Sequence, residues 1–331
     1  MSKLTWTITP QSPFRTPLQS DTLFGHICWA IRYALGEDRL VAFLHAYGPD
    51  HAPLLVSSGC PRGFLPMPVL KSITVEKEET LREKYFPKDE KRLDFYRALK
   101  RLSKTRYISH RLFSDVRDNL SAYEIYDFCF SKGLENNPDI IFSDEELPFD
   151  VSVETWHSEK NRLTDRAAHG KLYPLEDTFF REGTAFTVYL SNECFTPNEL
   201  SSILEYIAVE GYGADKSVGR GAFSYELTAG WDLPAASDPN GYMTLSHYHP
   251  TTGETVDGYY DVSTKFGKLG GHWAAGVEGG PHKKPLLMFN PGSCFKSATP
   301  KSFYGGLIRG VHAKPEVVHY GIALPLPVRF T

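Results

Sequence analysis

The sequence predicts an α+β protein that begins with a ferredoxin-like (RRM-like) β-α-β-β-α-β domain and ends with a second, β-rich domain. Two observations predict this class. Strand, helix and strand signals follow one another in that order in two separate segments of the first part. Residues 241–331 instead carry alternating strand patterns and turn signals without a long helical period. We therefore expect a domain over 1–232, with an insertion at about 60–181, and another over 241–331.

The first β-α-β unit is expected to consist of a strand over 3–9, a helix from Ser20 to Gly36, a short helix over 39–47 and a strand over 53–57. Leu4, Trp6 and Ile8 alternate as in a half-buried strand. Ser20 is a good N-cap, and glycine at position 36 commonly ends a helix.

The second unit is expected to consist of a strand over 184–190, a capped helix, a glycine loop over 211–221 and a strand over 222–228. Thr196 and Glu199 form a capping box, with Pro197 at the first helical position. A linker over 231–240 precedes the β-rich part, whose strands are expected at 242–248, 258–266, 285–289 and 317–324.

The insertion has a different composition. Residues 71–111 are rich in both charges and interleave cations with aromatic side chains. Two interpretations stay open here, a solvated helix face with ion pairs and an arm that faces nucleic acid. A helix is predicted over 120–132, a loop over 136–148 and a strand over 151–157.

The glycine loop, Gly-Tyr-Gly-Ala-Asp-Lys-Ser-Val-Gly-Arg-Gly, is the strongest functional signal in the chain. It leads from a helix into a strand, whereas a Walker A loop or a dinucleotide fingerprint leads from a strand into a helix. Neither motif fits the stretch. The loop is either a mobile surface turn or a basic, glycine-lined cradle for a phosphate backbone.

The overall composition limits the possible functions. The chain has 331 residues, a net charge of -4 and an ordinary globular balance of 41% hydrophobic and 23% charged residues. A polyanion would therefore have to bind to a local basic patch. No apolar run approaches the roughly 20 residues of a membrane span, so we expect a cytoplasmic protein.

No metal site or disulfide framework is predicted. The five cysteines are scattered without a CxxC pair. His247 and His249 lie two positions apart but have no Cys or acidic partner at metal-binding spacing. We interpret both as exposed strand histidines and expect no cofactor.

Several stretches in order resemble the fourth Csm subunit of type III-A CRISPR effectors, a family of repeat-associated (RAMP) proteins. They are Ser20–Trp29, Asn161-Arg162 with Leu172-Tyr173, Gly211–Gly221, Lys283–Phe289 with Pro291-Gly292-Ser293, and Tyr320–Pro325. The resemblance covers most of the chain and is weakest over 71–150. It implies RRM-like domains in both parts of the chain. It also implies a β-hairpin thumb in the insertion, which we place within 60–115, although that stretch is unusually charged for a hairpin.

The resemblance implies a non-catalytic subunit that holds the 5′ repeat-derived handle of the guide RNA. Such a subunit would cap the backbone filament beside an adjacent RAMP subunit and dock against the large polymerase-like subunit. Phosphates would lie along the glycine loop, contacted by Gly211, Gly213, Lys216, Ser217, Gly219, Arg220 and Gly221. Further candidate contacts are Arg15, Ser20, Arg162 and Arg166.

Two other functions stay open. Some RAMP relatives cleave repeat RNA with a histidine general base, for which His26, His110, His157 and His169 are available. No histidine has an obvious orienting partner in the sequence. The remaining alternative is a structural adaptor whose loops contact only protein.

Overall fold

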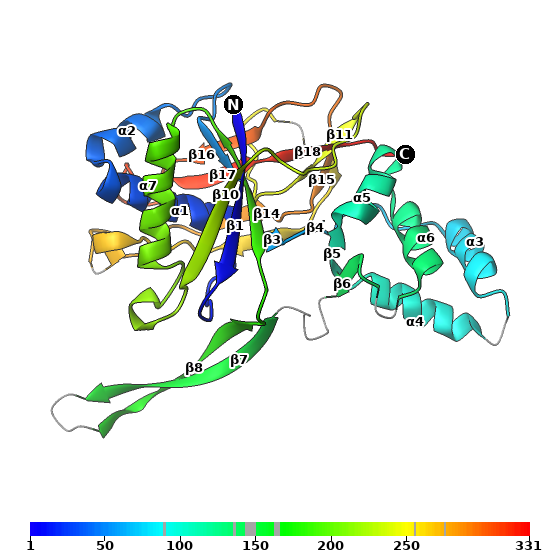
Figure 1. Ribbon diagram of the computed structural model, residues 1–331, viewed down its shortest axis with the longest axis horizontal. Coiled ribbons are helices and arrows are strands. Elements are labelled where there is room, and N and C mark those ends of the chain that lie inside the picture. Colours follow the sequence, from blue (N-terminus) through cyan, green and yellow to red (C-terminus); the bar gives the residue numbers. More distant parts are fainter. Residues whose placement is uncertain (89–90, 135–136, 143–149, 162–165, 255, 275) are drawn as a thin grey trace.

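A computed structural model describes residues 1–88, 91–134, 137–142, 150–161, 166–254, 256–274 and 276–331. It shows a mixed α/β protein with several small antiparallel sheets (Figure 1). Helices α1, α2 and α7 lie at one side of the molecule and a helical insertion lies at the other, while a long hairpin extends below the body.

The central sheet has the strand order β10-β1-β9-β2, and β3 also pairs with β9. Every pairing in this sheet is antiparallel, so that Trp6 in β1 lies opposite Val188 in β9 and Leu227 in β10. The bounds are Ser2–Pro10 (β1), Leu54–Val56 (β2), Cys60–Pro61 (β3), Phe186–Asn192 (β9) and Phe223–Ala229 (β10). The strands predicted over 3–9, 53–57, 184–190 and 222–228 are thus confirmed.

Three helices accompany this sheet, and α1 packs beside α7. Their bounds are Ser20–Ala34 (α1), Glu37–His45 (α2) and Pro197–Glu210 (α7). Apolar stripes bury one face of α1 and one face of α7. The predicted capping box is confirmed, since Thr196 Oγ1 accepts from Glu199 N–H and the Glu199 carboxylate accepts from Thr196 N–H.

Ser20 differs from its prediction. The N-cap of α1 is Gln19, and Ser20 is the first helical residue, completely buried. Its Oγ accepts a hydrogen bond from His247 N–H at 2.9 Å. The prediction of Ser20 as N-cap is therefore wrong, and its burial removes it from the surface that RNA could contact.

The insertion begins as a helical unit around a small sheet of order β4-β5-β6. Its elements are Phe64–Pro66 (β4), Val75–Tyr85 (α3), Arg92–Leu102 (α4), Thr105–Ser109 (β5), His110–Val116 (α5), a 3-10 turn over Arg117–Asn119, Ala122–Lys132 (α6) and Ile140–Phe142 (β6). The helix predicted over 120–132 is confirmed as α6, whereas the loop predicted over 136–148 contains β6. Residues 143–149 lie outside the described residues. Ion pairs such as Lys84–Asp127 and Arg97–Asp94 support the solvated-face interpretation of 71–111.

The long hairpin of the insertion is formed by Asp150–Asn161 (β7) and Arg166–Phe180 (β8), and it projects from the body (Figure 1). The placement of a hairpin thumb within 60–115 is therefore wrong, because the long hairpin lies outside that range and α3, α4 and α5 occupy half of it. The base of β8 joins the loop after β1. Phe14 and Thr178 exchange two backbone hydrogen bonds of 3.0 and 2.9 Å.

The described residues of 241–331 are β-rich, as predicted. Their strands are Gly241–Thr244 (β11), Gly258–Tyr259 (β12), Val262–Lys265 (β13), Leu286–Phe289 (β14), Cys294–Lys296 (β15), Tyr304–Ile308 (β16), His319–Ala323 (β17) and Pro325–Val328 (β18). Four of these strands form a sheet of order β12-β15-β11-β18. The helical structure described in this part is a 3-10 turn over Gly271–Ala274, so its RRM-like character stays a prediction.

One hydrophobic core crosses from the first part of the chain to the last. Phe24 in α1 stacks on Tyr320 in β17 with ring centroids 4.7 Å apart. The Tyr320 hydroxyl accepts a hydrogen bond from Val56 N–H in β2. Strand β17 is therefore part of the packing that holds α1 in place.

Candidate nucleic-acid interface

The glycine loop connects α7 to β10, as the sequence predicts, and its base is firmly anchored. Tyr212 is 1% exposed, and its hydroxyl donates to Pro17 C=O at 2.6 Å. The two ends of the loop meet where Tyr212 N–H donates to Gly221 C=O at 2.8 Å. Residues 214–219 at the tip are all exposed. The loop is thus a fixed base with an accessible tip, which is the geometry a backbone-binding cradle needs.

Two glycines are required where the loop closes. Gly221 has φ +73°, and a Cβ there would lie 1.9 Å from the Tyr212 carbonyl oxygen. Gly213 has φ +78°, and a Cβ there would lie 2.7 Å from Thr16 Cβ. Only glycine adopts such a conformation without strain and also permits the close backbone approach.

Two of the four arginines predicted to contact phosphate, Arg15 and Arg220, meet at Asp177, a residue of β8. Arg15 Nε donates to Asp177 Oδ1 at 2.7 Å, and Arg220 donates to Oδ2 from Nε at 3.0 Å and from Nη2 at 2.8 Å. The Asp177 side chain is completely buried, whereas those of Arg15 and Arg220 are 6% and 24% exposed. We call these three side chains the Asp177 hub. It joins the hairpin to the glycine loop.

The tip of the loop keeps a cation and several amides accessible. Lys216 is exposed and forms an ion pair with Glu210 at 3.1 Å, which is a weak interaction at a surface. The amides of Asp215, Lys216 and Ser217 donate to no described residue. The amides of Gly213 and Ala214 are already bonded, to His26 Nε2 and Thr16 Oγ1. Direct contacts to an anion are therefore available chiefly at 215–217.

Two further arginines are predicted contacts. Arg166 is the first residue of β8, and Arg162 lies outside the described residues. The structure thus brings Arg15 to Arg220 of the glycine loop and buries Ser20 completely.

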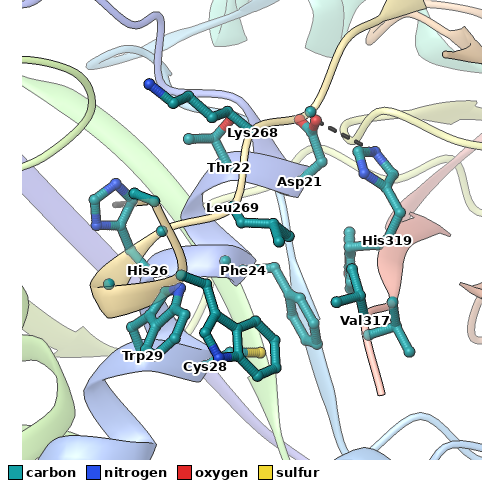
Figure 2. A pocket seen from close by; sticks show the side chains of 18 of the residues that line it. Asp21, Thr22, Phe24, His26, Cys28, Trp29, Lys268, Leu269, Val317 and His319 are labelled. Carbon is teal, nitrogen blue, oxygen red and sulfur yellow. Dashed lines mark ion pairs between the residues drawn. The ribbon is translucent and has the colours of Figure 1, made fainter. Parts of the chain in front are cut away.

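A buried polar cluster around Asp21 was not predicted. His319 Nε2 lies 3.4 Å from Asp21 Oδ2, Lys265 Nζ lies 3.5 Å from Oδ1, and His247 Nδ1 lies 3.9 Å from Oδ1 (Figure 2 shows the His319 pair). The interpretation of His247 as an exposed histidine is therefore wrong, because the residue is 5% exposed. The four residues come from distant parts of the sequence, so no local spacing could reveal them.

The electrostatics of this cluster follow from burial. Burial would raise the pKa of Asp21, but His319 and the charge of Lys265 outweigh it and hold that pKa below its usual range. Burial, assisted by the charge of Lys265, lowers the pKa of His247 to about 4. Burial also lowers the pKa of His319 and of Lys265. Both histidines are therefore neutral at pH 7.

We expect the free energy of unfolding to fall as the pH drops from about 6.5 to about 4. Burial lowers the pKa of His26 to about 4, as it does for His247, whereas an unfolded histidine titrates near 6.5. The folded state binds fewer protons in this window, so acid favours unfolding. Each histidine should contribute a loss of about 2 kcal/mol between pH 7.5 and pH 5. Urea unfolding at both pH values measures the loss, and His26→Gln should reduce it. An equal loss in that variant would contradict the assignment to His26.

The histidines proposed as catalytic bases lie on four different elements, α1, α5, β7 and β8. His26 Nε2 is occupied as the acceptor for Gly213 N–H. His110 Nε2 lies 3.3 Å from the Tyr189 hydroxyl, and burial lowers its pKa. His157 and His169 lie on β7 and β8. No observation on these residues favours catalysis over structure.

The described residues contain no group of three or more His, Cys, Asp or Glu side chains placed to hold a metal ion. None of the helices in the described part of the chain is both long and apolar enough to span a membrane.

No protein-family profile matches the chain, and no curated protein sequence matches it either. The structure, however, is similar over its whole length to a chain of a Csm1-Csm4 cassette solved with AMPPNP. That chain has 20% identity and a TM-score of 0.58, with 100% of this chain and 99% of that chain covered. The cassette solved with pppApA gives 19% identity and a TM-score of 0.57, with 100% and 99% covered.

A chain of the Csm3-Csm4 subcomplex of a type III-A CRISPR-Cas interference complex is also similar. It has 14% identity and a TM-score of 0.56, with 96% of this chain and 99% of that chain covered. Csm4 is the component that these structures share. The chain therefore shares its fold with chains of these Csm4-containing complexes.

Proposed function

We propose that this chain is the Csm4-like subunit of a type III CRISPR interference complex and holds the 5′ repeat-derived handle of the guide RNA without catalysing a reaction. The observation that supports this most is the exposed tip of the glycine loop on its buried, hydrogen-bonded base. The similarity of the fold to chains of Csm4-containing complexes supports the same role. In this role the protein would cap the backbone filament and dock the large polymerase-like subunit in the cytoplasm.

The fold supports a finer assignment. The strand order β10-β1-β9-β2, with α1 packed beside α7, is the order that a ferredoxin-like β-α-β-β-α-β domain over 1–232 requires. We propose this arrangement for the first domain, with an insertion at about 60–181, and an RRM-like origin for 241–331.

The proposed contacts follow from which donors the fold leaves accessible. Phosphate oxygens would accept hydrogen bonds from the amides of residues 215–217 and from the side chains of Lys216 and Ser217. Arg15 and Arg220 are candidate contacts that would also hold the loop in place through Asp177. Arg162 and Arg166 are further candidate contacts, and the hairpin of β7 and β8 would act as the thumb that redirects the strand.

Binding of the handle RNA should depend less on salt when Lys216 is replaced. We expect Lys216→Ala to lower the slope of log K against log[salt] by about 0.7, since one cation on a single strand accounts for roughly that value. Titration of the RNA at several salt concentrations measures the slope. Lys132→Ala is the control, because Lys132 is the last residue of α6. In Figure 1, α6 lies in the helical insertion, at the opposite side of the molecule from α7. An unchanged slope for Lys216→Ala would remove the loop from the interface.

A further inference from the structure

A cavity of about 930 Å³ lies along α1 beside the glycine loop (Figure 2). It is bounded by α1, by loop residues 213–216, by residues 265–274 and by residues 316–320. The volume falls within the roughly 300–1,000 Å³ typical of small-molecule sites. One end of the cavity therefore borders the loop tip where we place RNA phosphates.

Gly25 forms part of the cavity wall, and the protein's own packing does not explain it. Glycine in the interior of a helix costs about 1 kcal/mol relative to alanine. A Cβ at Gly25 would meet no atom within 4 Å, so no contact with a described residue excludes a side chain there. A glycine that is unfavourable for the helix and faces open space is consistent with close approach by a molecule from outside the chain.

The charges along the cavity are balanced. Five cationic side chains and five carboxylates line it, including the pairs Arg32–Glu37, Lys216–Glu210 and Lys265–Asp21. A phosphate would require an excess of cations. The lining is better suited to a molecule that is neutral and polar.

Aromatic side chains and convergent polar groups complete the lining. Trp29 and Trp273 contact each other edge to face, with ring centroids 5.7 Å apart. At the Asp21 end, the His319 side chain is buried, with 4% exposure. Its Nε2 lies 3.4 Å from Asp21 Oδ2 without a hydrogen bond of good geometry, so both groups can turn toward a ligand. An apolar, aromatic space with a carboxylate and an imidazole at one end matches a planar heterocycle with donors and acceptors on its edge.

We infer that this cavity receives one unstacked base of the RNA strand whose phosphates lie on the glycine loop. This inference rests on the proposed function. It adds the place at which the protein would recognise a base of the RNA. The loop would position the strand, and the cavity would give the site its dependence on the base. The competing occupant is a segment of a partner protein, which the balanced charges also permit. A protein segment would have no reason to lie beside the loop tip, whereas a base of the bound RNA strand would.

The test compares RNA with and without bases on variants of Gly25. The probes are the four homopolymeric octaribonucleotides and an abasic octamer of the same charge. Stacking and edge contacts of one base should give the wild-type protein at least about ten-fold tighter binding to one homopolymer than to the abasic octamer. Gly25→Leu projects a side chain into the cavity beside α1 and should reduce this preference to about two-fold or less, with unchanged affinity for the abasic octamer. Gly25→Ala, which adds only a methyl group, should keep most of the preference.

The outcomes separate this inference from the proposed function. Gly25→Leu should melt at or above the wild-type temperature, because leucine is a better helix former than glycine; Gly25→Met is a second, more flexible filler. Equal wild-type affinity for all five RNAs would overturn the cavity inference and leave the loop proposal standing. The cavity inference would also be overturned if Gly25→Leu bound all five RNAs as the wild type does. If that variant also failed to retain a co-expressed large subunit, the occupant of the cavity would be a partner protein. Failure of the wild type to bind any of the RNAs would overturn both proposals.

Discussion

Replacement of Asp177 by alanine is expected to lower the free energy of unfolding by about 3 kcal/mol. Removal of one member of a buried ion pair leaves its partners without compensation, which typically costs roughly 3–5 kcal/mol. The lower end applies because Arg220 is 24% exposed and Arg15 also contacts Asp215. Urea unfolding monitored by circular dichroism measures the change.

Glu210→Gln is the matched control, since it breaks the exposed Lys216–Glu210 pair. A loss below about 1 kcal/mol is expected there. Asp177→Ala should also alter the distance between the hairpin and the body, because the hub joins β8 to the glycine loop. Spin labels on β8 and α7 can measure that distance. If the stability loss is no larger than in Glu210→Gln and the distance is unchanged, the hub does not hold the hairpin.

The second large effect is expected for Gly221→Ala, with a loss of at least about 3 kcal/mol. The left-handed conformation alone costs an alanine roughly 1–2 kcal/mol. In addition, the new Cβ would lie 1.9 Å from the Tyr212 carbonyl oxygen, so the backbone that closes the loop must move. Tyr212, which anchors the base, would move with it. Affinity for the handle RNA should fall together with stability.

Gly219→Ala provides the comparison within the same loop. Gly219 has φ +83°, but a Cβ there would meet no atom within 4 Å. Its replacement should therefore cost only the conformational strain of about 1–2 kcal/mol. Thermal melting of the two variants side by side separates strain from collision. Equal losses of stability in the two variants would show that the backbone accommodates the Cβ at position 221 without a further free-energy cost.

Local sequence patterns predicted the elements that depend on neighbours in the chain. Period-two alternation located the strands of the central sheet, and the capping box located the start of α7. The strand predicted over 151–157 lies within β7, but its partner β8 was not predicted, so the long hairpin was misplaced. Ser20 resembled an N-cap, but its hydroxyl is used by His247, a residue that lies 227 positions away in the sequence.

In the candidate site, too, some features could be predicted from the sequence and others could not. Glycines and cations in one short segment were visible in the sequence, and so was the helix-to-strand connection that presents them. Asp177 was not visible, because a lone aspartate in a strand carries no signal until Arg15 and Arg220 fold around it. The cluster around Asp21 and the cavity beside Gly25 likewise arise from several distant segments.

By itself, the sequence determined the order of strands and helices in the two β-α-β units and the character of the loop between α7 and β10. Those properties depend on backbone preferences and on side chains a few residues apart. Only the tertiary structure decided which cations stay accessible, which histidines are neutral and where the cavity opens. Burial and ion pairing depend on residues that are far apart in the chain, and packing alone brings them together.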